Sequence, residues 1–148
     1  MDSGLPEPVE QVAALCWRAR PLPEVLLITS LNARRWIMPK GWPIAGKSLA
    51  ESAAQEAFEE AGIRGEMTPG AIGHFHYLKA KKDGSALPVR VAVFALKVTG
   101  HRRKWPERGA REMVWLPLDQ AAARVAEPGL RRILLSFRKS LAPQQRTA

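Results

Sequence analysis

The chain has 148 residues, 46% of them hydrophobic and 25% charged, which suits a single domain over residues 1–148 with an ordered core at about 7–142. No run approaches the ~18 consecutive apolar residues of a membrane helix, and the N-terminus lacks the basic and apolar regions of a signal peptide, so neither a membrane protein nor a secreted one is expected. The net charge of +9 favours a polyanionic partner, such as a nucleotide, a polyphosphate or a nucleic acid.

Several short apolar runs have the composition and flanking turn residues that are typical of β-strands. They span residues 12–17, 25–28, 36–38, 74–81, 90–98 and 112–116. The first two are separated by a proline-rich segment and are expected to pair antiparallel. The Asp83–Gly84 pair predicts a turn, and therefore a hairpin, between the fourth and fifth runs. Residues 91–96 are continuously apolar, as expected for a strand covered on both faces.

Helical signals lie between and after these runs. Ser48 and Glu51 form a capping box ahead of alanine-rich sequence, so a helix is expected to begin at Ser48. It should end at Gly62, because glycine suits the position just past a helix C-terminus. Pro117 is expected to start a short helix, and an apolar stripe with helical spacing runs through residues 130–141. Strands interspersed with helices predict an α/β (α+β) fold, a mixed α/β sandwich.

The first of these helices carries a group of carboxylates. Glu56, Glu59 and Glu60 share one helical face at ~100° per residue. The residues expected to pack against a sheet lie roughly opposite, and they are Ala50, Ala54, Ala57, Phe58 and Ala61. Like charges at these spacings repel, and a hard divalent cation with oxygen ligands, such as Mg²⁺, would offset the repulsion. The alternative is an ordinary solvated acidic face.

The residues around the carboxylates favour the metal-binding alternative. Residues 41–63 resemble the Nudix box, whose pattern is G-x5-E-x7-R-E-U-x-E-E-x-G-U, with U a bulky aliphatic residue. Gly41, Glu56, Glu59, Glu60, Gly62 and Ile63 match this pattern, whereas Lys47, Gln55 and Ala57 depart from it. Residues 36–41 and 111–121 also resemble the family's strand into the box and its late strand before a short helix. The resemblance covers most of the chain and implies a Nudix-type α/β/α sandwich with a mixed β-sheet.

The resemblance also implies an activity, that of a metal-dependent pyrophosphohydrolase acting on a phosphoanhydride bond. The substrate would be a nucleoside diphosphate derivative, a dinucleoside polyphosphate or an inositol pyrophosphate. Residues 36–40 and the end of the helix resemble the diphosphoinositol polyphosphate and diadenosine polyphosphate branch of the family. The implied cofactor is Mg²⁺ or Mn²⁺, held by Glu56, Glu59, Glu60 and the backbone carbonyl of Gly41.

Hydrolysis also needs a general base that takes a proton from the attacking water, and its position varies across the family. Glu60 or Glu56 is the first expectation for this role. Glu107 and Glu112, which lie outside the box, are the weaker candidates.

Two charged positions of the box are replaced together, since Lys47 stands where the family has a glutamate and Gln55 where it has an arginine. Loss of only one partner would leave an unpaired charge, which is the costly case when it is buried. Gln55 is therefore expected to support the site by orienting a glutamate as a neutral donor. The alternative is a catalytically weak or inactive Nudix-fold protein that senses a nucleotide or polyphosphate.

Basic residues near the box are expected to bind substrate phosphates. They are Lys40, Lys47, Arg35 and Lys79, with Lys81 and Lys82 as further candidates. Trp42 or Tyr77 would stack on a base or shield the cleft, with simple packing as the alternative. His74 and His76 fall on the same side of a strand and are expected in core or substrate-edge roles.

Other expectations concern partners and location. A basic nucleic-acid-binding module is a remote alternative, because the chain has no helix-turn-helix signature, no aromatic–basic repeat and no Cys/His metal module. Cys16 is the only cysteine and is expected to be a small core residue, so a reducing cytoplasm is the predicted location. The sequence leaves open whether the protein is a monomer or a homodimer.

Overall fold

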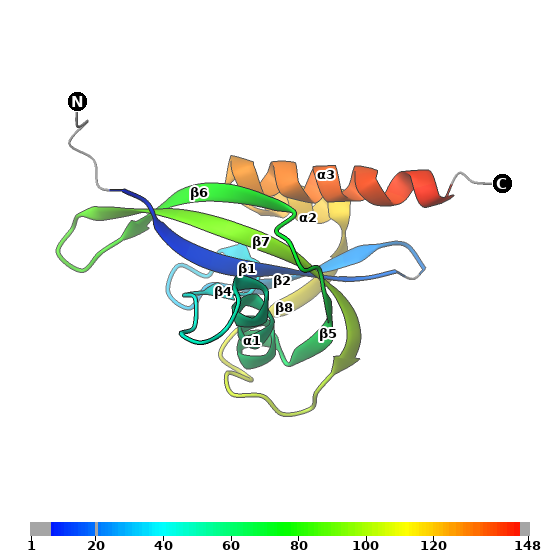
Figure 1. Cartoon of the computed structure of the whole chain (residues 1–148), viewed down its shortest axis with the longest axis horizontal. Helices are drawn as coiled ribbons and strands as arrows, with labels where there is room; N and C mark the ends of the chain where they lie inside the picture. The colour runs from blue at the N-terminus through cyan, green and yellow to red at the C-terminus, as the bar shows by residue number, and fades with distance from the viewer. Residues whose placement is uncertain (1–6, 20, 146–148) are drawn as a thin grey trace.

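The computed structural model describes residues 7–19 and 21–145, which form a mixed β-sheet flanked by helices (Figure 1). The strands are β1 (Val9–Arg18), β2 (Glu24–Thr29), β3 (Trp36–Ile37), β4 (Lys40–Gly41), β5 (Ile63–Met67), β6 (Gly73–Ala80), β7 (Ala86–His101) and β8 (Met113–Pro117). The helices are α1 (Leu49–Ala61), α2 (Leu118–Arg124) and α3 (Pro128–Gln145). Helix α3 thus continues past Ala142, where the ordered core was expected to end, whereas residues 1–6 lie outside the described ranges. No helix in the described ranges is long and apolar enough to cross a membrane.

The centre of the sheet is the parallel pair β1 and β7, aligned from Val9 opposite Val89 to Trp17 opposite Lys97. The strand order is β3-β2-β1-β7-β5, with β4 paired to β1, β6 to β7 and β8 to β2. The antiparallel pairing of β1 with β2 and the β6–β7 hairpin are confirmed. Strand β5 was not predicted, because residues 64–66 are exposed and show neither an apolar run nor alternation.

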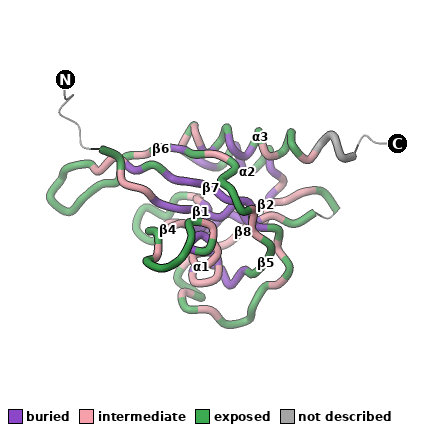
Figure 2. The backbone as a smooth tube through the Cα atoms, viewed as in Figure 1, coloured by how far each residue is buried: buried purple, intermediate pink, exposed green. Residues whose placement is uncertain are grey.

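Helices cover both faces of the sheet, with α1 on one side and α2 and α3 on the other (Figure 1). The buried segments follow the central strands (Figure 2). Val91 and Val93 of β7 pack on the side of α2 and α3, while Ala92 and Phe94 pack on the side of α1. This alternation confirms that the apolar run is covered on both faces and that the fold is an α/β/α sandwich.

The ends of α1 follow the local sequence signals. The backbone N–H of Glu51 donates to the Ser48 Oγ at 3.0 Å, and the Glu51 carboxylate accepts from the Ser48 N–H at 2.7 Å, so the capping box is confirmed. Gly62 ends the helix in the left-handed conformation, with φ of 70°. Helix α1 therefore occupies the residues that its caps predict.

The face that α1 buries differs from the expectation. Ala53, Ala57 and Ala61 lie four residues apart and are fully buried against the sheet, in the same cluster as Cys16, which confirms the core role of that cysteine. Ala54 and Phe58, which were expected to be buried, are only half-buried. The buried face of α1 therefore lies closer to the glutamates than was expected, and Glu60 is buried as a result.

Candidate active site

Strand β1 changes partner along its length, and this change places the start of the box next to α1. Its C-terminal end pairs with β2. Nearer its N-terminal end, Val12 lies opposite Gly41 and Ala13 opposite Lys40 in β4. The Ala14 N–H also donates to the Pro39 carbonyl at 2.9 Å. Lys40 and Gly41 are therefore fixed on the central sheet.

Gly41 lies directly against a glutamate of α1. A Cβ atom at this position would be 2.5 and 2.7 Å from the carboxylate oxygens of Glu56, closer than such atoms approach one another. Only glycine leaves the Glu56 carboxylate where the structure has it. The strand β4 and the acidic face of α1 thus meet at this residue.

A cleft of about 840 Å³ opens beside this contact. It is lined by Gln11, Ser30, Leu31, Asn32, Ala33, Arg35, Ile37, Lys40, Gly41, Trp42, Pro43, Ile44, Glu56, Glu59, Glu60, Tyr77, Leu78, Lys79, Ala80, Arg111 and Glu127. The structure thus brings together the proposed metal ligands Gly41, Glu56, Glu59 and Glu60 and the proposed phosphate-binding residues Arg35, Lys40 and Lys79. Lys47 and Gln55 instead line a separate depression of about 280 Å³.

The carboxylates of α1 differ sharply in their surroundings. Glu60 is only 6% exposed and shares a hydrogen bond with Glu56. Burial, followed by this hydrogen bond, raises the pKa of Glu60 to about 8, and burial also raises the pKa of Glu56. Glu59 accepts a hydrogen bond of 2.6 Å from the Gln55 amide, which is the contact that the orienting role expected of Gln55 would use.

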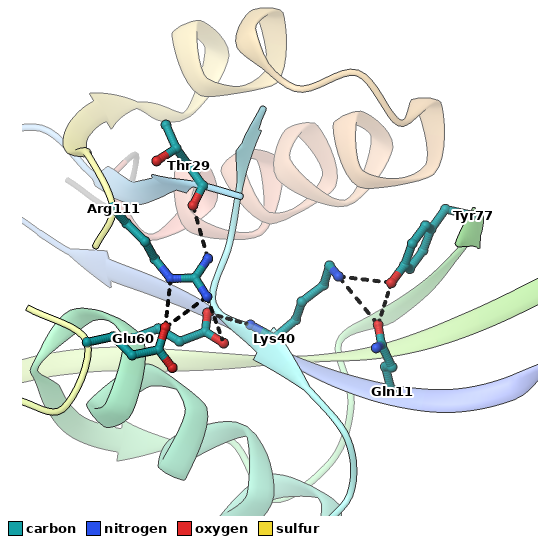
Figure 3. Close-up of polar contacts among 7 residues, drawn as sticks. Gln11, Thr29, Lys40, Glu60, Tyr77 and Arg111 are labelled. Carbon is teal, nitrogen blue, oxygen red and sulfur yellow. Dashed lines mark hydrogen bonds and ion pairs between the residues drawn. The ribbon is translucent and has the colours of Figure 1, made fainter. Parts of the chain in front are cut away.

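A buried arginine reaches the same carboxylates from the loop between β7 and β8. The guanidinium of Arg111 lies 3.7 Å from a Glu60 oxygen and 3.0 Å from a Glu107 oxygen. It also donates to the Thr29 carbonyl at 3.0 Å (Figure 3). Glu107 is thereby engaged as a partner of Arg111 and does not line the cleft, which disfavours it as the base.

A second polar group, formed by Lys40, Tyr77 and Gln11, also lines the cleft and lies away from Glu60 and Arg111 (Figure 3). The Lys40 ammonium donates to the Tyr77 hydroxyl at 2.9 Å, and that hydroxyl donates to the Gln11 carbonyl oxygen at 2.7 Å. Burial lowers the pKa of Lys40, while the nearby Glu60 carboxylate opposes the shift. Lys40 also contacts Glu60 through its backbone N–H, at 3.4 Å.

Comparisons with known proteins agree with this geometry. The sequence profile of the NUDIX domain matches residues 9–137. The chain belongs to the Nudix family. It is 30% identical over 126 residues to Nudix hydrolase 12, mitochondrial, of Arabidopsis thaliana, covering 83% of this chain and 62% of that relative. It is 30% identical over 115 residues to the bovine diphosphoinositol polyphosphate phosphohydrolase 3-beta, covering 76% and 66% of the two chains.

Solved structures show the same fold. A binary complex of the Caenorhabditis elegans Ap4A hydrolase matches with a TM-score of 0.67 and 22% identity, covering 91% of this chain and 98% of that one. The Nudix chain described here spans less than two thirds of the length of the two curated relatives named above.

The donor set of this Nudix site suits the divalent metal that Nudix hydrolases generally need. Glu56 and Glu60 present adjacent carboxyl groups, and the Glu56 carboxylate lies against the Gly41 backbone, where any side chain would collide with it. Hard divalent cations prefer such oxygen ligands. Within residues 7–19 and 21–145, no three His, Cys, Asp or Glu side chains already converge as ligands.

Several residues that were expected at the site lie outside the cleft. Lys47, Lys81 and Lys82 do not line the cleft. Their positions on loops gave no information about the direction in which they face. His74 and His76 are exposed on β6 and so have no core role, and they do not line the cleft.

Glu112 is exposed and lies 3.8 Å from Arg34, outside the cleft, so it is a poor candidate for the base.

Other residues of the cleft were missed. Gln11 and Arg111 lie in the cleft and were not predicted there. The sequence held no clear signal for Gln11, because it follows Glu10 at the polar start of β1, although the structure leaves it only 3% exposed.

Proposed function

We propose that this Nudix protein is a metal-dependent pyrophosphohydrolase that cleaves the phosphoanhydride bond of a nucleoside diphosphate derivative or a dinucleoside polyphosphate. The observation that carries the proposal is that one cleft contains both the paired carboxyl groups of Glu56 and Glu60 and the half-buried ammonium of Lys40. Carboxylates serve metal binding and proton transfer, whereas an ammonium stabilises phosphate charge.

In the reaction, water displaces one phosphate group from the phosphorus atom of the neighbouring phosphate. The water oxygen bonds to that phosphorus, the bond from phosphorus to the bridging oxygen breaks, and the leaving phosphate keeps the bridging oxygen. Glu60 is the proposed acceptor of the proton that the water releases. Glu60 lines the cleft, and a carboxylate held at the reacting phosphorus can accept this proton.

A bound Mg²⁺ or Mn²⁺ would neutralise phosphate charge and acidify the attacking water. Glu56, Glu59, Glu60 and the carbonyl of Gly41 are the groups proposed to hold it. Their arrangement around the Gly41–Glu56 contact supports this assignment, since β4 and α1 approach there without an intervening side chain.

Lys40 is proposed to bind a substrate phosphate. Its ammonium is held by the Tyr77 hydroxyl at 2.9 Å and lies 4.6 Å from the centre of the Tyr77 ring. An ammonium fixed in this way loses little further freedom when an anion binds. Arg35 and Lys79 are exposed at the same cleft and are proposed to contact more distant phosphates.

The apolar lining favours a substrate with a nucleoside over an inositol pyrophosphate. Leu31, Trp42 and Leu78 all line the cleft, although they are 53%, 46% and 69% exposed. Exposed large apolar side chains gathered at a cleft are typical of binding sites for planar or apolar groups. An inositol pyrophosphate offers phosphates on every side and no such group, so it would leave these side chains without a partner.

The test is a panel of phosphoanhydrides assayed for phosphate and pyrophosphate release with Mg²⁺, with Mn²⁺ and with chelator. The panel includes nucleoside triphosphates, diadenosine polyphosphates, nucleotide sugars, dinucleotide cofactors and inositol pyrophosphates. We expect turnover that needs metal, is highest on a substrate with a nucleoside and is lost in Glu60→Gln. Glu66→Gln is the matched control, because Glu66 is an exposed carboxylate on β5 outside the cleft.

The competing function is a sensor that binds nucleotides without cleaving them, and the changed box positions Lys47 and Gln55 favour it. The hydrogen bond from Gln55 to Glu59 argues for a site that still orients its carboxylates. Tight nucleotide binding without metal, together with no turnover on any member of the panel, would establish the sensor and refute the enzyme.

A further inference from the structure

Helix α1 has no positive charge of its own. Its sequence, LAESAAQEAFEEA, contains four glutamates and no lysine, arginine or histidine. The side chain that holds Glu59 is the neutral amide of Gln55. Among the described residues, the cation within 4 Å of an α1 carboxylate is Arg111, at 3.7 Å from Glu60.

Arg111 is fixed on several sides before it meets Glu60. Its Nε and Nη2 donate to one oxygen of Glu107, at 3.1 and 3.0 Å, and its Nη1 donates to the Thr29 carbonyl at 3.0 Å. The side chain is only 8% exposed. Because the guanidinium is planar and rigid, these contacts set the direction in which it faces Glu60.

The loop that carries Arg111 is also attached to α1 through the backbone. The Glu107 N–H donates to the Glu59 carbonyl at 3.0 Å, and the Arg102 N–H donates to the Gly62 carbonyl at 2.8 Å. These carbonyls belong to the C-terminal turn of α1 and its cap. These two hydrogen bonds attach the loop to the end of the helix and so help to fix Arg111 relative to Glu60.

We propose that Arg111 is a positioning residue for the hydrolysis proposed above, and that it holds the Glu60 carboxyl group in its working orientation from outside the box. The inference rests on the proposed function, since Glu60 is assigned there as the proton acceptor. Glu60 and Glu56 are adjacent carboxyl groups in a poorly solvated place, and one buried cation beside Glu60 favours its charged form. Without it, the Glu60 side chain would turn away from Glu56 and from the reacting phosphate.

The test uses the whole protein and the best substrate of the panel. In Arg111→Ala we expect kcat to fall by ~100-fold, the loss typical of a misplacement of about 1 Å, with KM unchanged within about two-fold. Free guanidinium ion at tens of millimolar should restore part of kcat by entering the vacated space between Thr29, Glu107 and Glu60. Urea has a similar shape without the charge and should restore nothing.

Arg34→Ala is the matched control. Arg34 attaches the same loop, by donating to the Ala110 carbonyl at 3.1 Å and pairing with Glu112 at 3.8 Å, but it contacts no glutamate of α1 and does not line the cleft. We expect it to keep wild-type kcat. If Arg111→Ala does not fold, Arg111→Lys takes its place. We expect an intermediate kcat, because lysine supplies the charge without the planar set of donors of a guanidinium.

Different outcomes separate the possible failures. A rise in KM at constant kcat would make Arg111 a substrate-binding residue and overturn the inference. An equal fall in kcat in Arg34→Ala, or a loss in Arg111→Ala that guanidinium does not relieve, would reduce Arg111 to a structural tether of the loop. Absence of turnover in the unmodified protein would overturn the proposed function and the inference together.

Discussion

Replacement of Gly41 by alanine tests the contact between β4 and α1. The new Cβ would lie 2.5 Å from one carboxylate oxygen of Glu56, and ordinary contacts begin at 3.4 Å, so this carboxylate must move by about 0.9 Å. The end of a glutamate side chain moves easily, and the backbone of Gly41 does not have positive φ. We therefore expect the substitution to displace Glu56 without unfolding the protein.

The size of the effect follows from the displacement. A misplacement of about 1 Å at a reacting centre lowers a rate by ~100-fold, which is about 2.7 kcal/mol of activation free energy. The melting temperature should stay within about 3 °C of wild type, since a change of 1 kcal/mol shifts it by only a few degrees in a chain of this size. The metal concentration for half-maximal activity should rise as well, because Glu56 is a proposed ligand.

The assay is steady-state hydrolysis of the best substrate over a range of Mg²⁺ concentrations, with a thermal melt of each variant. Gly100→Ala is the control, because a Cβ at Gly100 meets nothing within 4 Å and its φ is not positive. Wild-type kcat and metal activation in Gly41→Ala would refute the assignment of the Gly41–Glu56 contact to the metal site. A large loss of melting temperature would show that the contact is structural.

Three further predictions concern side chains of the cleft. In the metal-free protein, the raised pKa of Glu60, about 8, contributes stability that is complete below the unfolded pKa of about 4.5 and is lost as pH rises to about 8, so Glu60→Gln should weaken the pH dependence of the melting temperature between about pH 5 and 8. Tyr77→Phe removes the hydroxyl that holds Lys40, and we expect KM to rise ~10-fold with kcat little changed, measured by steady-state kinetics. Gln55→Ala removes the 2.6 Å hydrogen bond to Glu59 and should raise the metal concentration for half-maximal activity ~10-fold, measured by metal titration.

Each of these has a result that would contradict it. Equal pH slopes in Glu60→Gln and wild type would show that another group titrates. An unchanged KM in Tyr77→Phe would remove Lys40 from phosphate binding. Identical metal titrations in Gln55→Ala would mean that the orientation of Glu59 does not matter for the metal.

Local signals in the sequence determined the elements that carry the chemistry. The capping box at Ser48 and the left-handed glycine at Gly62 set the ends of α1, because both act within one helical turn. The Asp83–Gly84 turn gave the β6–β7 hairpin, and the continuous apolar run gave a strand covered on both faces. The resemblance to the Nudix box gave the family, since its residues lie within one stretch of chain.

The tertiary structure alone decided how the cleft is completed. Gln11 and Arg111 come from distant parts of the chain and meet there because β1 pairs with both β4 and β7 and because the loop after β7 returns to α1. Such contacts depend on strand register and on the side of α1 that packs, and neither is set by local periodicity. The side of α1 that buries Glu60 was missed for this reason, and the same packing brings Glu60 to Arg111.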